Sequence, residues 1–382
     1  MSLILKNARV VCRDWIRECD IKIDGSLISE LGRNLPACEE DEIFDCKGAT
    51  VMPGFIDTHL HGAYGCEMVS DDFDLEKFSR FEATEGVTGL APTSSSHSIE
   101  TLERCIRAVA KKEKEKKSGA KILGIHAEGP FLNPERKGGM LAEHIQVPSV
   151  EKLDRLIEAS DGLLKLLTVA PELDGAIEVI KHAVKKGIKV SMGHTSASYD
   201  EAMAALDAGA SQMTHTFNAA RAFNHREPGV LGAALTDDRV KCEMICDFAH
   251  LHQATTKLIY KAKGADRINM ISDTSSPAGL DESKLSYPGS NVRVVGKVIL
   301  LEDGTISGST QTLYDGVKNL ASVGIPLVDI ARMASYNPAC TLGVEDKVGS
   351  IEVGKCADLV VLDSDMSIIS VYIDGNKVDT DI

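Results

Sequence analysis

The sequence predicts an α/β fold in which a TIM-like (β/α)8 barrel carries a small β-sandwich domain built from both termini. From Pro53 onward, short apolar runs alternate with amphipathic stretches about eight times, which is typical of parallel strands joined by helices. Several of these apolar runs stop at a His, Glu or Asp. Both ends of the chain instead show short strand patterns separated by turns. A chain of 382 residues is long enough for one large and one small domain.

The small domain is expected to comprise residues 1–52 and 346–382. Asp24-Gly25 is typical of a hairpin turn between two strands near the N-terminus, and Asp374-Gly375 repeats this signal near the C-terminus. The N-terminal strands are expected over residues 3–5, 8–11, 20–23 and 27–31. Strands at both ends of the chain need pairing partners, so we expect the N-terminal and C-terminal strands to pair with each other in one domain. Residues 53–345 then form the barrel.

The barrel is expected to contain eight strands whose carboxyl ends meet at one rim. These strands end near His61, Ser95, Glu128, Pro171, His194, Phe217, His250 and Asp273. Amphipathic patterns predict intervening helices over residues 99–117, 150–159, 175–186 and 199–208. A hairpin-like insert over 279–307 and two helices over 312–322 and 327–335 are expected after the last strand.

Composition argues against several classes of protein. A net charge of −15 disfavours a nucleic-acid groove, which needs clustered Lys and Arg to neutralise phosphates. No apolar run reaches the roughly 20 residues that span a bilayer, so no membrane partner is expected. The ten cysteines lack a CxxC or framework spacing, and the first residues lack a secretory pattern. A cytoplasmic protein with reduced thiols is therefore expected.

Metal-ligand residue types gather at the predicted rim. His59 and His61 are two residues apart, so both point to the same face of a strand and can reach one ion. Five further strands end near a residue of this kind: Glu128, His194, His215, His250 and Asp273. Imidazole and carboxylate together suit zinc, iron or another divalent transition metal.

Such a metal lowers the pKa of a bound water to about 7 and polarises a carbonyl group. A neighbouring carboxylate can take the proton of that water and pass it to a leaving nitrogen. The residue set therefore predicts amide hydrolysis by a metal-dependent hydrolase barrel.

The chain resembles the amidohydrolase superfamily over nearly its whole length and, within it, the N-acetylglucosamine-6-phosphate deacetylase family. The matching stretches are PGFIDTHLHG (53–62), HAEGPFLN (126–133), GHT (193–195), THTFNA (214–219), REPG (226–229) and SD (272–273). Many superfamily members have the first and last of these, whereas HAEGPFLN, FNA and REPG narrow the resemblance to the deacetylase branch. This resemblance implies removal of the acetyl group from a small-molecule amino sugar phosphate.

The resemblance also implies a role for individual residues. Glu128, His194 and His215 are expected to hold the principal metal, and His59 and His61 to join Glu128 around a second one. One or two zinc or iron ions per subunit follow from this. Asp273 is expected to act first as general base and then as general acid.

The remaining matches concern the substrate. His250 and Arg226 are expected to bind the sugar phosphate, with Arg226 supplied by the neighbouring subunit of a homodimer. A guanidinium suits phosphate because it donates two hydrogen bonds at once. Asn218 and the backbone of Ala219 are expected to contact the substrate as well.

One departure from the family concerns the sugar. Met140 stands where members commonly have a substrate-contacting His, and His144 is a possible replacement. The galactosamine epimer, N-acetylgalactosamine-6-phosphate, therefore stays an alternative substrate. Of the other histidines, His97, His182 and His225 are expected at the surface.

Two rival functions fit the sequence less well. A cyclic-amide hydrolase of the dihydropyrimidinase type bridges its metals with a carboxylated Lys at a strand's carboxyl end, but Lys165 falls at the beginning of its predicted strand. A scaffold protein that has lost its ligands is disfavoured, because every ligand type and the base are present.

Overall fold

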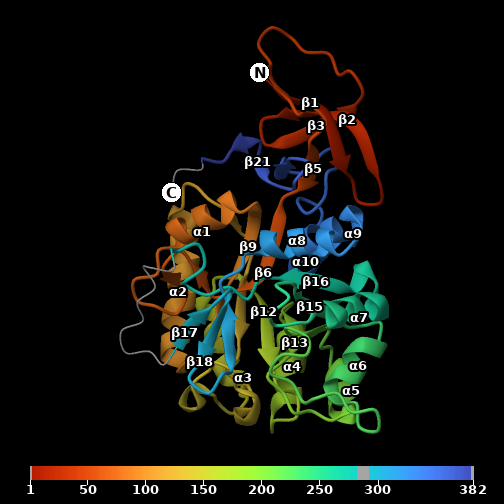
Figure 1. Cartoon of the computed structure of the whole chain (residues 1–382). Coiled ribbons are helices and arrows are strands. Elements are labelled where there is room, and N and C mark those ends of the chain that lie inside the picture. The colour runs from red at the N-terminus through yellow and green to blue at the C-terminus, as the bar shows by residue number, and fades with distance from the viewer. Residues whose placement is uncertain (1, 282–291, 380–382) are drawn as a thin grey trace.

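The computed structural model describes residues 2–281 and 292–379. It consists of a barrel with a small β domain at one end, and both chain termini lie on the side of the β domain (Figure 1). This arrangement confirms the predicted fold class. The predicted domain boundaries, at 52/53 and 345/346, stay predictions.

The small domain is one eight-stranded sheet that combines both ends of the chain. The strand order is β22-β21-β20-β5-β1-β2-β3, with β4 beside β1. Strand β5 of the N-terminal part pairs antiparallel with β20 of the C-terminal part, with Val51 opposite Val361. The strands are β1 (Leu3–Val11), β2 (Ile16–Asp24), β3 (Leu27–Gly32), β4 (Glu42–Asp45), β5 (Thr50–Pro53), β20 (Leu359–Leu362), β21 (Ile368–Ile373) and β22 (Asn376–Lys377). The two short strands expected over 3–5 and 8–11 are one strand, β1, with a register shift between Leu5 and Ala8.

Eight parallel strands form the barrel. They are β6 (Phe55–Leu60), β9 (Val87–Ser94), β11 (Ile125–Glu128), β12 (Leu164–Val169), β13 (Lys189–Met192), β14 (Gln212–Met213), β15 (Lys241–Ile245) and β16 (Ile268–Ile271). Strand β6 pairs with β9, and the others follow in chain order. The first and last strands meet through a backbone hydrogen bond of 2.9 Å from the Asp273 amide to the His59 carbonyl.

Helices cover the barrel, and each predicted helix is present within a few residues of its expected bounds. They are α1 (Leu75–Thr84), α2 (Ile99–Glu115), α3 (Val150–Ala159), α4 (Ala176–Lys185), α5 (Tyr199–Asp207), α6 (Gly229–Thr236), α7 (Gln253–Lys263), α8 (Leu313–Ser322), α9 (Leu327–Ala331) and α10 (Asn337–Leu342). The helix expected over 327–335 is interrupted, because a π-helical segment (Arg332–Tyr336) follows α9. None of the helices in the described ranges combines the length and the apolar character needed to cross a membrane.

Three short additions accompany the barrel. The predicted insert contains a three-stranded antiparallel sheet of β17 (Val292–Val295), β18 (Val298–Leu301) and β19 (Ile306–Ser309). Residues 282–291 of this insert lie outside the described residues. The strands β7 (Gly62–Ala63) and β8 (Cys66–Glu67) form a hairpin after β6, and β10 (Lys121–Ile122) pairs with β9. The Ser309 amide donates to the Asp273 carbonyl at 3.0 Å, so the insert contacts the last barrel strand.

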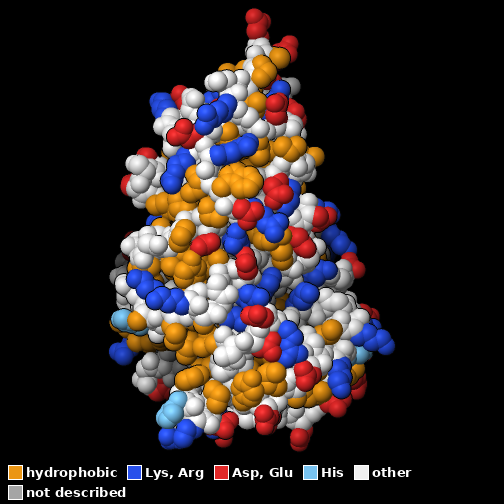
Figure 2. Space-filling model, turned by 90° about the vertical axis from the view of Figure 1, so that its right-hand side faces the viewer, with side chains coloured by type: hydrophobic (Ala, Val, Ile, Leu, Met, Phe, Trp, Pro, Cys, Tyr) orange, Lys and Arg blue, Asp and Glu red, His pale blue; other side chains and the backbone are white. Residues whose placement is uncertain are grey.

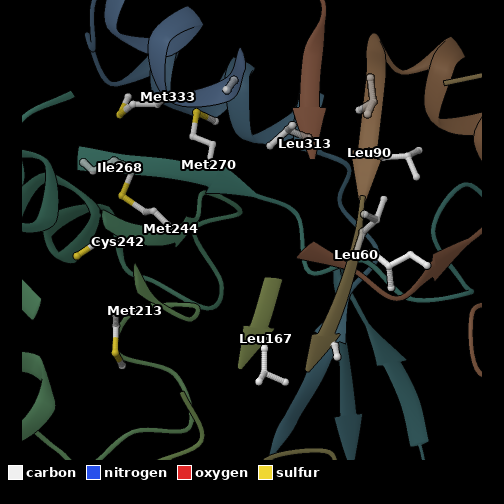
Figure 3. Packing of buried hydrophobic residues seen from close by; sticks show 14 of the residues in the cluster. Leu60, Leu90, Leu167, Met213, Cys242, Met244, Ile268, Met270, Leu313 and Met333 are labelled. Carbon is white, nitrogen blue, oxygen red and sulfur yellow. The ribbon is translucent and has the colours of Figure 1, made fainter. Parts of the chain in front are cut away.

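Apolar side chains on one face of the barrel strands pack against the surrounding helices. Figure 3 shows Cys242 and Met244 of β15 and Met270 of β16 in this layer, together with Met333. Because side chains alternate along a strand, the residues between them point into the barrel. Glu243 lies between Cys242 and Met244, so this strand turns a carboxylate inward.

Charges of both signs are mixed on the surface. Figure 2 shows Lys and Arg side chains interspersed with Asp and Glu over the face that carries α5, α6, α7 and α9. The excess of acidic over basic residues is therefore not gathered into one block on this face.

Candidate metal centre

Five predicted ligand residues converge at the carboxyl end of the barrel. His59 belongs to β6, His61 follows it, and Glu128 is the last residue of β11. Nε2 of His59 lies 3.2 Å from Oε1 of Glu128, and Nε2 of His61 lies 3.3 Å from Oε2 of the same carboxylate. These three residues form one triple of ligand atoms that lie within 4.8 Å of one another.

A second triple shares the same carboxylate. His194 follows β13 and His215 follows β14, and Nε2 of each lies 3.1 Å from Oε1 of Glu128. The two Nε2 atoms are themselves 3.1 Å apart. Glu128 is thus common to both triples of candidate ligands.

The hydrogen bonds of the Nδ1 atoms show which nitrogen of each imidazole faces the centre. Nδ1 of His61 donates to the Thr93 carbonyl at 3.1 Å, and Nδ1 of His194 donates to the Arg136 carbonyl at 2.8 Å. A carbonyl oxygen only accepts, so Nδ1 carries a hydrogen, and Nε2 is the nitrogen that faces Glu128 and can bind a metal. This is the usual orientation of a metal-binding His.

Asp273 lies beside the first triple, with Oδ1 at 3.3 Å from Nε2 of His61 and 3.6 Å from Nε2 of His59. Burial lowers the pKa of His61, but Asp273 and Glu128 outweigh burial and raise it to about 10. Burial raises the pKa of Glu128, but His59 and His194 outweigh it and hold that pKa well below its usual range. Positive charge close by thus stabilises the buried carboxylates. A divalent cation held by the Nε2 atoms would supply such charge.

The backbone is strained where the strands stop. His194, His215 and Asp273 have φ of 48°, 26° and 54°, and Phe217 and Ala219 have φ of 79° and 45°. Residues with side chains rarely adopt positive φ, at a cost of about 1–3 kcal/mol each. This sharp turn explains why β14 ends at Met213, before the expected end near Phe217.

A cavity of about 520 Å³ opens beside these residues. Of the predicted substrate residues, Met140, Asn218, Ala219 and His250 line it. Nδ1 of His250 donates to Oδ2 of Asp247 at 2.6 Å. Burial lowers the pKa of His250, but the Asp247 carboxylate outweighs it and raises the pKa, which favours a cationic ring at the cavity wall.

Arg226 is not among the residues that line this cavity. Its side chain is exposed, with Nη1 at 3.0 Å from Nε2 of His225. A single chain therefore does not bring Arg226 to the centre. Supply of Arg226 by a neighbouring subunit stays a prediction.

His97, expected at the surface, is partly exposed and also lines the cavity, which its sequence context did not indicate. Its ring packs on that of His144, with ring centroids 3.9 Å apart. His144 also lines the cavity, so the possible replacement for the missing family His is near the substrate space. His252 caps the N-terminus of α7, as its side chain accepts from the Ala254 amide.

Three carboxylates around the centre were missed by the sequence analysis. Glu243 contacts His59, Glu172 binds the loop that follows His194, and Glu67 lines the cavity. Glu243 was detectable as a lone acidic residue within an apolar strand. Glu172 lies in a loop and Glu67 in the two-residue strand β8, and neither has a strand pattern around it that would single it out. Lys165 is the second residue of β12, at the end of the strand remote from the rim.

Known proteins resemble this chain over nearly its whole length. The Amidohydrolase family profile matches residues 50–378. The chain is 36% identical to N-acetylglucosamine-6-phosphate deacetylase of Bacillus subtilis, over 98% of this chain and 96% of that protein. It is 32% identical to N-acetylgalactosamine-6-phosphate deacetylase of Escherichia coli O157:H7, over 98% and 99% of the two chains.

A solved structure resembles the whole chain. A mutant of N-acetyl-D-glucosamine-6-phosphate deacetylase from Mycobacterium smegmatis, in complex with N-acetyl-D-glucosamine-6-phosphate, superposes with a TM-score of 0.90 at 32% identity. The match covers 100% of this chain and 99% of that one.

Proposed function

Because the chain belongs to the amidohydrolase family, a metal-dependent family, we propose that it hydrolyses N-acetylglucosamine-6-phosphate to glucosamine-6-phosphate and acetate. The observation that carries this proposal is the pair of ligand triples that share Glu128, with Asp273 beside them. Relatives that cover nearly the whole chain are named for this reaction, which supports the substrate class.

In this proposal Glu128, His194 and His215 hold the principal metal, and His59 and His61 with Glu128 hold a second one. The N and O ligands are suited to zinc or iron. When bound, the metal supplies a Lewis acid that polarises the acetamido carbonyl and acidifies water.

Asp273 carries the proton. Its carboxylate accepts a proton from the attacking water and then delivers it to the nitrogen of the leaving amine. The hydrogen bond from its own amide to the His59 carbonyl fixes Asp273 beside the first triple, so the side chain stays close to the reacting atoms.

The rest of the cavity binds the sugar phosphate. His250 and the Arg226 of a neighbouring subunit clamp the phosphate, and Asn218 and the Ala219 backbone contact the sugar. This assignment makes the enzyme a homodimer. The cavity volume of about 520 Å³ lies within the range of small-molecule sites.

We also assign the enzyme to the cytoplasm. The ten cysteines are free thiols, most of them buried, which suits a reducing compartment.

N-Acetylgalactosamine-6-phosphate is the second candidate substrate. It is favoured by Met140 in the cavity wall, at a position where the family commonly has a substrate-contacting His, and by the relative named for the galactosamine reaction. The two sugars differ in the orientation of one hydroxyl group, so their discrimination depends on residues such as Met140 and His144.

A side-by-side assay tests the proposal. Acetate release is measured with both phosphorylated sugars and with plain N-acetylglucosamine, before and after removal of metal by a chelator. We expect N-acetylglucosamine-6-phosphate to have the highest kcat/KM and the chelated protein to regain activity with zinc or iron. A metal-loaded protein that hydrolyses neither phosphorylated sugar would overturn the proposal.

A further inference from the structure

Glu243 is a buried carboxylate that lies behind the candidate metal centre. It has no exposed surface and points into the barrel from the middle of β15. A carboxylate placed there is costly unless other groups hydrogen-bond to it. The contacts of its two oxygens show what compensates this cost.

One oxygen of Glu243 contacts both ligand triples. Oε2 accepts a hydrogen bond of 2.9 Å from Nδ1 of His59, which belongs to the first triple. The same atom accepts a hydrogen bond of 3.1 Å from the backbone amide of His215, which belongs to the second. Since Nδ1 and Nε2 lie on opposite edges of the His59 ring, Glu243 contacts this ring from the side away from Glu128.

The other oxygen is held by a chain of side chains inside the barrel. Oε1 accepts from Nε2 of Gln212 at 2.7 Å, and Oε1 of Gln212 accepts from Nδ2 of Asn269 at 3.2 Å. Nδ2 of Asn269 also donates to Oγ1 of Thr341 in α10 at 2.9 Å. Side chains from β14, β16 and α10 therefore orient the carboxylate, which in turn orients His59.

A direct metal role for Glu243 fits the contacts less well. His59, His126 and Glu243 also bring ligand atoms within 4.8 Å of one another. However, the ring nitrogens of His126 already face the Thr58 carbonyl at 3.1 Å and Oγ1 of Thr168 at 2.9 Å. Nδ1 of His59 donates to Glu243 itself, so these atoms are used in hydrogen bonds within the protein.

We infer that Glu243 is a positioning residue that couples the two metal positions, because its Oε2 fixes one ligand of each triple. Its carboxylate increases the basicity of His59 and holds the backbone turn that carries His215. This inference rests on the proposed metal-dependent function. It adds that loss of Glu243 weakens metal binding at both positions, although Glu243 touches neither the cavity nor the substrate.

The test is metal binding by Glu243→Gln, a variant of nearly equal volume without the charge. The apo-protein is titrated with Co²⁺ and followed by visible absorption and by metal content after dialysis. Partners of metal-bound His typically contribute 10- to 100-fold to affinity, so we expect a loss of about that size for both equivalents and a changed cobalt spectrum. Activity at saturating metal should recover more than activity at limiting metal.

A composition-matched control separates positioning from general stability. The double variant Gln212→Glu/Glu243→Gln keeps one carboxylate and one amide in the barrel but moves the charge away from His59. We expect its metal affinity to stay low. If Glu243→Gln does not fold, Glu243→Asp replaces it as the test variant. This variant keeps the charge but shortens the side chain by one methylene, so the carboxylate no longer reaches His59 and the metal affinity should fall as well.

Wild-type affinity for both Co²⁺ equivalents and an unchanged spectrum in the folded variant would overturn the inference. The proposed function would then still stand, because it is measured on the wild-type protein. Conversely, a wild-type protein that binds no Co²⁺ would overturn both.

Discussion

At the scale of single residues, the two carboxylates of the candidate metal centre have different surroundings and therefore different proposed roles. Glu128 touches four imidazole rings, whereas Asp273 lies at one side, with Oδ1 at 3.6 Å from Nε2 of His59 and 3.3 Å from Nε2 of His61. The first arrangement suits a shared ligand and the second a proton carrier. Substitutions at these two positions should therefore impair the protein differently, one in turnover and the other in metal binding.

Asp273→Asn should retain its metal while kcat falls by about 10²- to 10⁴-fold, because an amide neither accepts the proton of water nor delivers one to the amine. The backbone bond from residue 273 to the His59 carbonyl does not involve the side chain, so the fold should persist. Metal analysis and steady-state kinetics check both parts. Near-normal turnover in a metal-loaded variant would remove Asp273 from the mechanism.

Glu128→Ala should lose metal and activity together, because Glu128 belongs to both triples. We expect less than one equivalent of metal after dialysis, and metal content is the measurement. Asp273→Asn serves as the control for loss of a buried carboxylate at the same centre. Full occupancy in Glu128→Ala would contradict its assignment as a ligand.

At the scale of elements, the ends of the strands place the ligands. Gly193 precedes His194, and a Cβ at this position would lie 2.6 Å from Cβ of Thr214 and 2.8 Å from Cγ2 of Thr168. Thr168 of β12 and Thr214, which follows β14, thus lie against the end of β13. The position of the His194 ring depends on this close approach.

Gly193→Ala should accordingly displace His194, lower metal affinity and cost about 1–3 kcal/mol of unfolding free energy through overpacking. The matched control is Ser198→Ala, which removes the N-cap of α5 in the same segment. That change should cost about 1 kcal/mol and leave metal affinity unchanged. Chemical denaturation and metal titration give both quantities, and equal metal affinities in the two variants would contradict the role of Gly193.

At the scale of the whole molecule, a charged cluster joins the barrel to the small domain. Nζ of Lys121, in β10, lies 2.9 Å from Oδ2 of Asp358 and 2.6 Å from Oδ1 of Asp374. The Asp358 side chain is only 5% exposed. Burial raises the pKa of Asp358, and Lys121 opposes that rise. The cluster therefore requires the lysine in order to keep a buried charge.

Lys121→Met should cost about 3 kcal/mol, because removal of one partner leaves the other charge buried and unpaired. An acid whose pKa is higher in the folded than in the unfolded state binds more protons when folded, so stability falls as pH rises through that range. The deficit of the variant should therefore be smaller at pH 5 than at pH 7 in urea denaturation. A deficit independent of pH would show that the lysine acts by packing alone.

The proposed dimer gives a second prediction at this scale. Arg226→Ala should reduce the preference for phosphorylated over plain N-acetylglucosamine, since a hydrogen bond to a charged group contributes about 1.5–3 kcal/mol. The remote phosphate positions the acetamido group, so the loss should appear in kcat/KM. Kinetics with both sugars provide the measurement.

Mixing subunits tests whether Arg226 acts across the interface. Heterodimers of Arg226→Ala and Asp273→Asn chains contain one site with both defects and one intact site. Activity should return on mixing, at about the wild-type level per intact site. If subunit exchange is demonstrated and no activity returns, the phosphate site is built within one chain.

Much of the architecture follows from local patterns. The alternation of apolar runs and amphipathic stretches predicts the barrel, and polar residues at the ends of those runs predict the five ligands. Both depend on neighbours in the chain, since strand and helix periodicity are local properties. Strands β14 and β15 end at Met213 and Ile245, earlier than the predicted ends near Phe217 and His250. The strained turns that follow these strands depend on contacts with other strands, which the local sequence pattern does not contain.

The sequence by itself thus determined the fold class, the family and the residue types at the rim. Only the tertiary structure decided that Glu128 is common to both triples, that His97 lines the cavity, and that Arg226 lies away from the centre of its own chain. It also decided that Glu243 meets His59, although the two are 184 residues apart. The physical reason is barrel closure, which brings together side chains from strands distant in the sequence, and no local periodicity encodes those distances.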